Sequence, residues 1–415
     1  MRRTTLPLAV CGLSLSLLAT ACSSGFDKSE GPAQDSSGKQ QLKMLIATSG
    51  NAETSAVKAA AAAWAKATGN SVTVDIAQNI DQQLGQSFAG SNPPDVFYTS
   101  ADQFSTYAKG GSLYAYGGKL KDRDAYSPAL TRAFTYDDTL YCAPKDQSTL
   151  GLAVNTALWK KAGLTDADYP KTWDDLEAVA KKLTKDGVTG LSVNADYNQL
   201  GAFFKQSGSW LTSPDQKKMT AGDKANVAAL TYVKKLLTEG VLKFPKDLDS
   251  GWGGEAFGKG KAAMTIEGNW LAGAMRKDFP DTAYKVVPLP AGPGGKGTMA
   301  FTNCWGIAAK SKHQAAAVDL VNELTSDGNQ LKFAKTVGVM PSKKTLLETY
   351  KQQNPDSAAW ADGTAAAQLP VNAPGMRQVM AQFNTSLAQL ASSDPAKLLA
   401  DLQKNGESVL GGSGR

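Results

Sequence analysis

The chain has 415 residues, with 44 Lys plus Arg against 38 Asp plus Glu and a formal net charge of +6. This length predicts two packed cores, because single cores rarely grow beyond about 250 to 300 residues. The basic surplus is scattered and forms no stripe with interleaved aromatic residues, which argues against a nucleic-acid partner. The single histidine, His313, leaves the chain without the clustered His and Cys ligands that zinc needs.

The N-terminus has the pattern of a lipoprotein signal peptide, expected over residues 1–21. Arg2 and Arg3 form its positive region, and residues 6–18 form an apolar run too short to span a bilayer. Small residues then lead to Cys22. We therefore expect Cys22 to carry the lipid that anchors the mature chain.

Residues 22–41 are rich in Ser, Gly, Asp and Gln. Such a segment has little apolar surface to bury, so it is expected to be a flexible tether. The two segments together predict a lipid-anchored protein on the extracytoplasmic face of the cell membrane. Two alternatives stay open: a plain secretory signal with a chance cysteine near the cut, and a buried first helix.

Strand and helix patterns alternate along the rest of the chain, which predicts an α/β fold with mostly parallel sheets. The expected strands lie at 42–47, 72–76, 95–98, 150–154, 262–266, 285–289 and 305–309. The expected helices include 53–68, a helix between Ser100 and Gly110, and 173–185, which a capping box of Thr172 and Asp175 opens. After Thr345 the pattern is helical and shows no strand signal.

Two cysteines remain in the body of the chain, Cys142 and Cys304. An exported chain favours a disulfide between them. Each precedes an apolar, strand-like run, so the bond would restrain a hinge if both strands ran between the same two lobes. The alternative is a pair of buried free thiols.

Several segments carry a resemblance to a known family. They are 140–144 (LYCAP), 152–155 (LAVN), 158–164 (LWKKAGL), 170–176 (PKTWDDL), 257–264 (FGKGKAAM), 267–270 (EGNW), 288–295 (PLPAGPGG) and 305–308 (WGIA). In this order and spacing, behind a lipoprotein signal, the chain resembles the carbohydrate-binding family of ABC-transporter solute-binding proteins, the maltose-binding protein family. Cys142 departs from that pattern, which usually has a small or apolar residue there, and so does its partner Cys304.

The resemblance implies a two-lobed, type II periplasmic-binding-protein-like fold with a ligand cleft between the lobes. It places three hinge crossings near Leu150, Cys304 and Met340. Lobe one would comprise 42–149 plus 306–338, and lobe two 150–303 plus 341–410. Closure around ligand would be a hinge motion.

A sugar site needs flat aromatic platforms and planar hydrogen-bonding groups, because pyranose rings have apolar faces and hydroxyl edges. Trp64, Trp159 and Trp173 fall within helical patterns, so they are expected in the core. The candidate platforms stand beside glycines or at element ends, and they are Trp210, Trp252, Trp270 and Trp305. For Trp270 the resemblance agrees, since the tryptophan of that motif commonly stacks on ligand, while Trp360 fits either role.

The candidate polar ligands follow expected strands or lie by the crossings. They are Asn51, Tyr98, Asp102, Asp146 and Asn303. A capping or turn role would explain each of them equally well.

The resemblance and the candidate residues together predict a lipid-anchored, monomeric receptor that captures a sugar, expected to be an oligosaccharide, and delivers it to the permease of an ABC importer. It would use no cofactor and perform no chemistry. His313 lies in a polar helix start and no G-x-S-x-G elbow exists, which argues against a Ser-His-Asp hydrolase. The alternatives are a surface-anchored glycosidase with Asp102 and Glu267 as its carboxylates, and a binding protein of the same fold for a polyamine, metal or anion.

Overall fold

The structure is a computed structural model, and it describes residues 38–47, 50–90 and 92–412. The predicted signal peptide and Cys22 lie outside these residues, so lipid attachment remains a prediction. The first strand begins at Gln41, the last residue of the predicted tether. Within the described ranges, none of the helices combines the length and apolar character needed to cross a bilayer.

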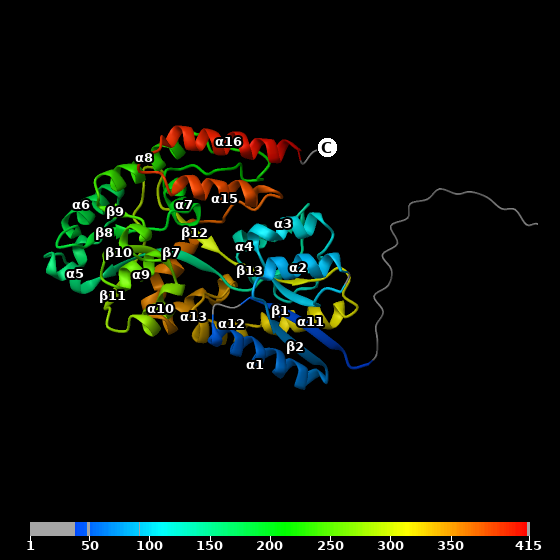
Figure 1. The fold of residues 1–415 in the computed structure, drawn as a ribbon. Coiled ribbons are helices and arrows are strands. Elements are labelled where there is room, and N and C mark those ends of the chain that lie inside the picture. The colour runs from blue at the N-terminus through cyan, green and yellow to red at the C-terminus, as the bar shows by residue number, and fades with distance from the viewer. Residues whose placement is uncertain (1–37, 48–49, 91, 413–415) are drawn as a thin grey trace, which may run out of the picture. The chain divides into compact units, whose positions relative to one another are not determined.

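Two sheets organise the described chain (Figure 1). The first has the order β2-β1-β3-β13-β6 and is made of β1 (Gln41–Ile46), β2 (Ser71–Ile76), β3 (Val96–Ser100), β6 (Ala143–Pro144) and β13 (Asn303–Ile307). The second has the order β14-β12-β7-β10-β8-β9, with β11 also paired to β7. Its strands are β7 (Ser148–Asn155), β8 (Thr189–Ser192), β9 (Leu242–Lys243), β10 (Ala262–Gly268), β11 (Tyr284–Val287), β12 (Thr298–Phe301) and β14 (Ala367–Gln368). A separate two-stranded ribbon joins β4 (Thr135–Tyr136) to β5 (Thr139–Leu140).

Each sheet has its own helices and its own hydrophobic core, which confirms the two-lobed α/β fold. Lobe one carries α1 (Asn51–Thr68), α2 (Ile80–Ala89), α3 (Ala101–Lys109), α4 (Pro128–Ala133), α11 (Gln314–Leu324) and α12 (Asp327–Val337). Lobe two carries α5 (Thr156–Lys161), α6 (Trp173–Leu183), α7 (Tyr197–Gln206), α8 (Lys224–Thr238), α9 (Gly253–Gly258), α10 (Trp270–Asp278), α13 (Leu347–Gln353), α14 (Ala358–Gly363), α15 (Met376–Leu387) and α16 (Pro395–Gly412). The limits of the lobes given above were not tested separately and stay predictions.

Local signals in the sequence set several helix ends. Gly69 ends α1 in the left-handed conformation, with φ 77°, where a residue with a Cβ would be strained. At the start of α6, Thr172 accepts a hydrogen bond from the Asp175 backbone, and the Asp175 side chain accepts one from the Thr172 backbone. The capping box is therefore confirmed, with Asp in place of the usual Glu.

Three expectations about strands were wrong in part. The sheets are mixed, because β13 and β7 run antiparallel to neighbours that include β3 and β10. A short strand, β14, follows Thr345 and pairs with β12. Cys304 lies inside β13, whereas Cys142 precedes the two-residue strand β6. Strands near the crossings pair with strands that are remote in sequence. The hydrophobic pattern of a single segment does not show which strand it will pair with or in which direction.

The chain passes between the sheets at three places, and these crossings are hydrogen-bonded to one another. The first crossing links β6 to β7, and the second is Thr302, between β12 and β13. Thr302 Oγ1 donates to the Asp146 carbonyl at 2.7 Å. Gln147 and Met340 exchange backbone hydrogen bonds of 2.9 and 3.0 Å, which place the third crossing on the other side of the first.

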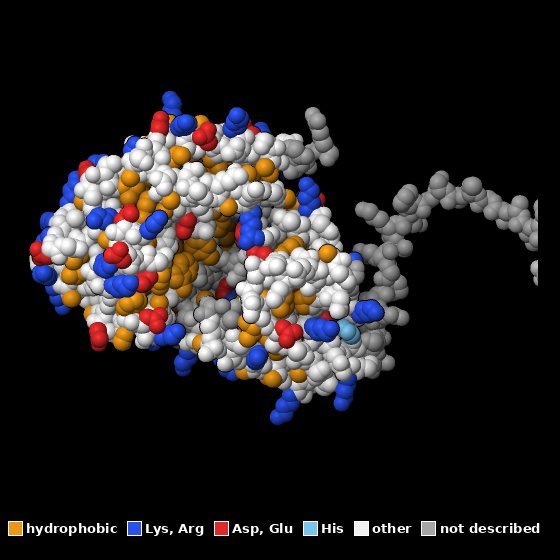
Figure 2. Space-filling model, viewed as in Figure 1, with side chains coloured by type: hydrophobic (Ala, Val, Ile, Leu, Met, Phe, Trp, Pro, Cys, Tyr) orange, Lys and Arg blue, Asp and Glu red, His pale blue; other side chains and the backbone are white. Residues whose placement is uncertain are grey.

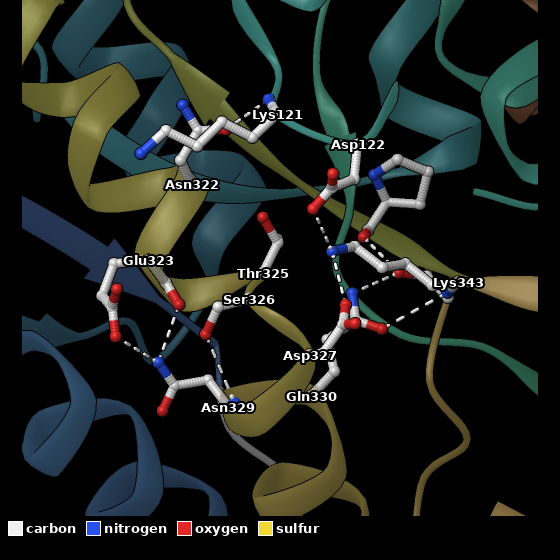
Figure 3. A network of polar contacts seen from close by, with 12 residues as sticks. Lys121, Asp122, Asn322, Glu323, Thr325, Ser326, Asp327, Asn329, Gln330 and Lys343 are labelled. Atoms are coloured by element: carbon white, nitrogen blue, oxygen red, sulfur yellow. Dashed lines mark hydrogen bonds and ion pairs between the residues drawn. The ribbon is translucent and has the colours of Figure 1, made fainter. Parts of the chain in front are cut away.

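The third crossing is fixed to lobe one by Lys343, whose side chain is only 2% exposed. Its Nζ lies 2.8 Å from Asp327 Oδ1 and 3.4 Å from Asp122 Oδ2 (Figure 3). The neighbouring Ser342 hydroxyl accepts from Gln330 of α12 and donates to the Pro144 carbonyl. These contacts hold the end of the crossing against the first sheet.

Candidate ligand-binding site

A hollow separates the two lobes, and hydrophobic side chains gather on its wall beside the second sheet (Figure 2). Among the described residues, the large hydrophobic side chains that stand exposed are Ile76, at 43%, and Trp270, at 41%. Ile76 ends the edge strand β2 of lobe one. Trp270 starts α10, two residues after the end of the central strand β10. Its ring lies against Phe301, which is the residue before the second crossing.

The Trp270 ring is held from three sides. Its Nε1 donates to Glu267 Oε2 at 2.9 Å, and its ring meets Phe301 edge-on at a centroid distance of 5.6 Å. The ring also lies across Gly268, where a Cβ would come within 2.2 Å of a ring carbon. Glycine at position 268 is what allows the indole to lie flat over the end of the strand.

Glu267 is buried beneath this ring, with 1% of its surface exposed. Burial raises the pKa of Glu267 to about 7, and hydrogen bonds from Gln199 and Trp270 offset this only in part. The Glu267 carbonyl accepts from Trp360 Nε1 at 2.9 Å. Trp360 itself is 1% exposed, so it belongs to the core rather than to a platform.

A buried ionic cluster lies at the first crossing, facing lobe one. Lys145 Nζ is 3.0 Å from Glu53 Oε1 and also pairs with Asp146. Tyr98 donates to the same Glu53 oxygen at 3.2 Å, and the Lys145 ammonium lies 4.7 Å from the centre of the Tyr98 ring. Burial would lower the pKa of Lys145, but the charges of Asp146 and Glu53 outweigh it and raise that pKa. Tyr98 and Asp146 thus bind neighbouring side chains in this structure.

The other predicted platforms differ in exposure. Trp305 is 3% exposed and packs edge-on against Tyr98 at 4.8 Å, so the structure places it in the core of lobe one. Trp252 is half-buried, and its ring lies over Gly254 at the start of α9. Trp210 is half-buried against the core of lobe two. The ring that contacts the Trp270 ring is that of Phe301, and none of these three tryptophans is seen against it.

The remaining polar candidates are also dispersed. Asn51 is exposed as the first residue of α1. Asn303 is half-buried in β13, and its carbonyl accepts from the Lys145 backbone at 2.8 Å. Asp102 lies in the first turn of α3 and is 3.4 Å from Arg377 Nε of lobe two.

The core expectations fared better: Trp64, Trp159 and Trp173 are 3%, 3% and 9% exposed, which confirms that they are buried. Sequence reasoning missed Glu53, Lys145, Phe301 and Arg377. Glu53 and Lys145 are 92 positions apart, and only the tertiary fold brings them together. The one sequence feature that could have indicated this ionic cluster was the adjacent pair of opposite charges, Lys145 and Asp146, close to a predicted crossing.

A second hollow lies within lobe one, between α1 and α12. It is open to solvent and is lined by residues that include Ala60, Trp305 and Phe333. Trp270 is not among its lining residues, whereas Lys145 of the buried ionic cluster is. Among the described residues, no group of His, Cys, Asp or Glu is arranged to hold a metal ion.

Residues 47–331 match the family described as bacterial extracellular solute-binding protein. The chain belongs to this family. The result confirms the family expected from the motifs and the extracellular class of the protein.

This solute-binding protein is 28% identical over 297 residues to the diacetylchitobiose binding protein DasA of Streptomyces coelicolor, covering 69% of each chain. Its fold matches the ABC substrate-binding protein Lmo0181 of Listeria monocytogenes in complex with cycloalternan, with a TM-score of 0.79, 24% identity, and 90% and 100% of the two chains covered. It also matches UgpB of Mycobacterium tuberculosis in complex with glycerophosphocholine, with a TM-score of 0.78, 19% identity, and 91% and 100% covered. The solved structures share the two-lobed fold.

Proposed function

We propose that this solute-binding protein is the receptor of an ABC importer, which captures an oligosaccharide between its lobes and delivers it to the permease. The observation that carries the proposal is Trp270. A large aromatic ring that is 41% exposed, at the place where the lobes meet, offers a flat apolar face that a ligand can cover. The apolar face of a pyranose ring fits such a surface.

The surroundings of Trp270 support this ligand class. The ring lies beside the second crossing, and the neighbouring Asn269 donates to the Gly338 carbonyl at the start of the third. A ligand stacked on Trp270 would therefore lie where the lobes meet, and closure would enclose it. Two similar proteins, a diacetylchitobiose binding protein and a substrate-binding protein in complex with cycloalternan, support a sugar as the ligand.

The glycosidase alternative needs two carboxyl groups that face a bound sugar. Asp102 is paired with Arg377, and Glu267 is 1% exposed with one oxygen bonded to Trp270. One of these carboxyl groups is thus engaged by a cation and the other is enclosed, which argues against a catalytic pair. The proposal is therefore capture without chemistry.

The alternative ligands of the same fold also fit less well. An anion site needs available cations or helix N-termini, whereas Lys145 and Arg377 near the lobe junction are both in ion pairs. The similarity to UgpB in complex with glycerophosphocholine makes a polar phosphodiester the second ligand class to test. Such a ligand forms the second arm of the screen.

The proposed anchor is a lipid on Cys22, which places the receptor on the extracytoplasmic face of the membrane as a monomer. The signal pattern and the family's extracellular class support it.

A thermal-shift screen of the mature protein tests the ligand class. The panel holds chito-, malto- and cyclic oligosaccharides, glycerophosphocholine, a polyamine and divalent cations. We expect one class of oligosaccharide to raise the melting temperature and to change tryptophan fluorescence without being hydrolysed. Stabilisation by another class alone, or turnover of a glycan, would contradict the proposal.

A further inference from the structure

We infer that Glu267 is a positioning residue: its carboxyl group holds the Trp270 ring in place, and ligand affinity depends on whether that group carries a proton. This inference rests on the proposed role of Trp270 as the ligand platform. It assigns to Glu267 a task different from catalysis and from direct contact with the ligand.

The geometry makes Glu267 the polar contact of the platform. Trp270 is 41% exposed, so packing alone restrains its ring less than that of a core tryptophan. The hydrogen bond from Trp270 Nε1 to Glu267 Oε2, 2.9 Å long, fixes the rotation of the indole about its side-chain bonds. Phe301 supports the ring from one side only.

Glu267 is itself held in a fixed position, so its hydrogen bond can fix the position of the Trp270 ring. It lies in β10, which pairs with β7 on one side and β8 on the other. Trp360 Nε1 donates to its carbonyl, and Gly151 lies opposite it in the β7 register. A side chain that is 1% exposed on a central strand has little freedom to move.

Groups on three neighbouring helices influence the pKa of Glu267. On α7, Asp196 raises the pKa of Glu267 by its negative charge, while Gln199 lowers it through a hydrogen bond. On α9, the Gly254 backbone lowers it, and on α10 the Trp270 indole does the same. Burial therefore prevails and raises the pKa of Glu267 to about 7.

The charged and neutral forms of Glu267 hold Trp270 differently. A carboxylate accepts a charge-assisted hydrogen bond from the indole, which is stronger than the bond to a neutral carboxyl group. As the pH falls through the pKa, the bond weakens and the ring becomes less well oriented. We expect ligand affinity to fall about threefold to tenfold between about pH 8 and pH 6. This range corresponds to the difference in strength between a charge-assisted and a neutral hydrogen bond.

The first measurement needs no ligand. In the ligand-free mature protein, the indole ¹⁵N–¹H resonance of Trp270, assigned by its loss in Trp270→Phe, should titrate with a midpoint near neutral pH. The titration should vanish in Glu267→Gln, which keeps an oxygen acceptor but cannot ionise. It should persist in the control Glu255→Gln, because Glu255 is a half-buried partner of Lys259 on α9 and does not contact the Trp270 ring.

The second measurement is the affinity for the best ligand of the screen across the same pH range. Wild type and Glu255→Gln should lose affinity as the pH falls, whereas Glu267→Gln and Trp270→Phe should show no such dependence. A Trp270 resonance that does not titrate, or one that still titrates in Glu267→Gln, would overturn the inference. A titrating resonance in a protein that binds no oligosaccharide would support the positioning contact and contradict the proposed function.

Discussion

Arg377 of α15 and Asp81 of α2 form an ion pair, with Nη2 and Oδ2 2.7 Å apart, and it joins lobe two directly to lobe one. Asp102 of α3 adds a second carboxylate at 3.4 Å from Arg377 Nε. Near this pair, the Asn372 side chain donates to the Ala133 carbonyl at 2.9 Å. The lobes are thus linked by side chains at a place separate from the three crossings.

We predict that Arg377→Gln weakens ligand binding about twofold to fivefold, because partly exposed ion pairs contribute about 0.2 to 1 kcal/mol. The loss should come from a closed state that is less favoured, so small-angle scattering should show a larger radius of gyration with ligand below saturation. Lys351→Gln is the control, since Lys351 pairs with Glu348 and Asp362 within lobe two. Equal affinities for both variants would contradict a role for the link.

Trp270→Ala should reduce sugar affinity at least about tenfold and leave the fold intact. The change removes the stacked ring, and aromatic contacts add about 0.5 to 1.5 kcal/mol beyond the area they bury. Calorimetry measures the affinity and circular dichroism the fold. Ile76→Ala is the matched control, because Ile76 is equally exposed, at 43%, but lies on the edge strand of lobe one. Unchanged affinity in Trp270→Ala would remove the basis of the proposed site.

Glu267→Gln should stabilise the protein at alkaline pH and have little effect in acid. The pKa of Glu267 is raised from 4.5 to about 7, so the folded state binds its proton more tightly than the unfolded state does. Its contribution to stability is complete below about pH 4.5 and is lost as the pH rises through 7. Gln avoids that loss, which is on the order of 3 kcal/mol. Urea unfolding at both extremes would show the difference, and an effect independent of pH would contradict it.

Reduction of the disulfide should lower the melting temperature while ligand affinity falls little. Cys142 and Cys304 are joined in the structure, with their Cα atoms 5.8 Å apart and a sequence separation of 162. Closing so long a loop stabilises by roughly 5 kcal/mol in the chain-entropy model. Both residues lie in the core of lobe one, away from Trp270. Thiol titration of the unfolded, unreduced protein should find neither sulfur free.

Cys22→Ala should release the protein into the medium. If Cys22 carries the lipid, a labelled fatty acid will tag the wild type and fail to tag the variant. Cys11→Ala serves as the control, because that residue lies in the apolar part of the signal and should leave with it. A variant that stays in the membrane fraction would show that another anchor holds it.

The sequence predicted features whose cause is local. Gly69 and the Thr172–Asp175 capping box end and begin helices through contacts within a few residues, and both were expected. The EGNW motif likewise indicated Trp270, since a tryptophan after a glycine at a strand end has room to lie exposed.

Features that depend on distant partners could not be predicted in this way. Trp305 also stands beside a glycine, yet it packs on Tyr98 because β13 inserts beside β3. The antiparallel pairing of β13 and the Lys145–Glu53 contact both arise when the chain returns to lobe one. Trp305 and Trp270 therefore look alike in sequence and differ in the fold.

The hydrogen bonds between the three crossings have a consequence for how the lobes can move. Because Thr302, Asp146, Gln147 and Met340 are bonded side by side, the crossings form a narrow strip. Hydrogen bonds between the crossings resist sliding of one past another more than bending of all three together, so we expect closure to be a hinge rotation about this strip. A rotation of this kind would bring the same residues of the two lobes together each time the hollow closes. A ligand on the proposed Trp270 platform would therefore meet the same opposing groups at every closure.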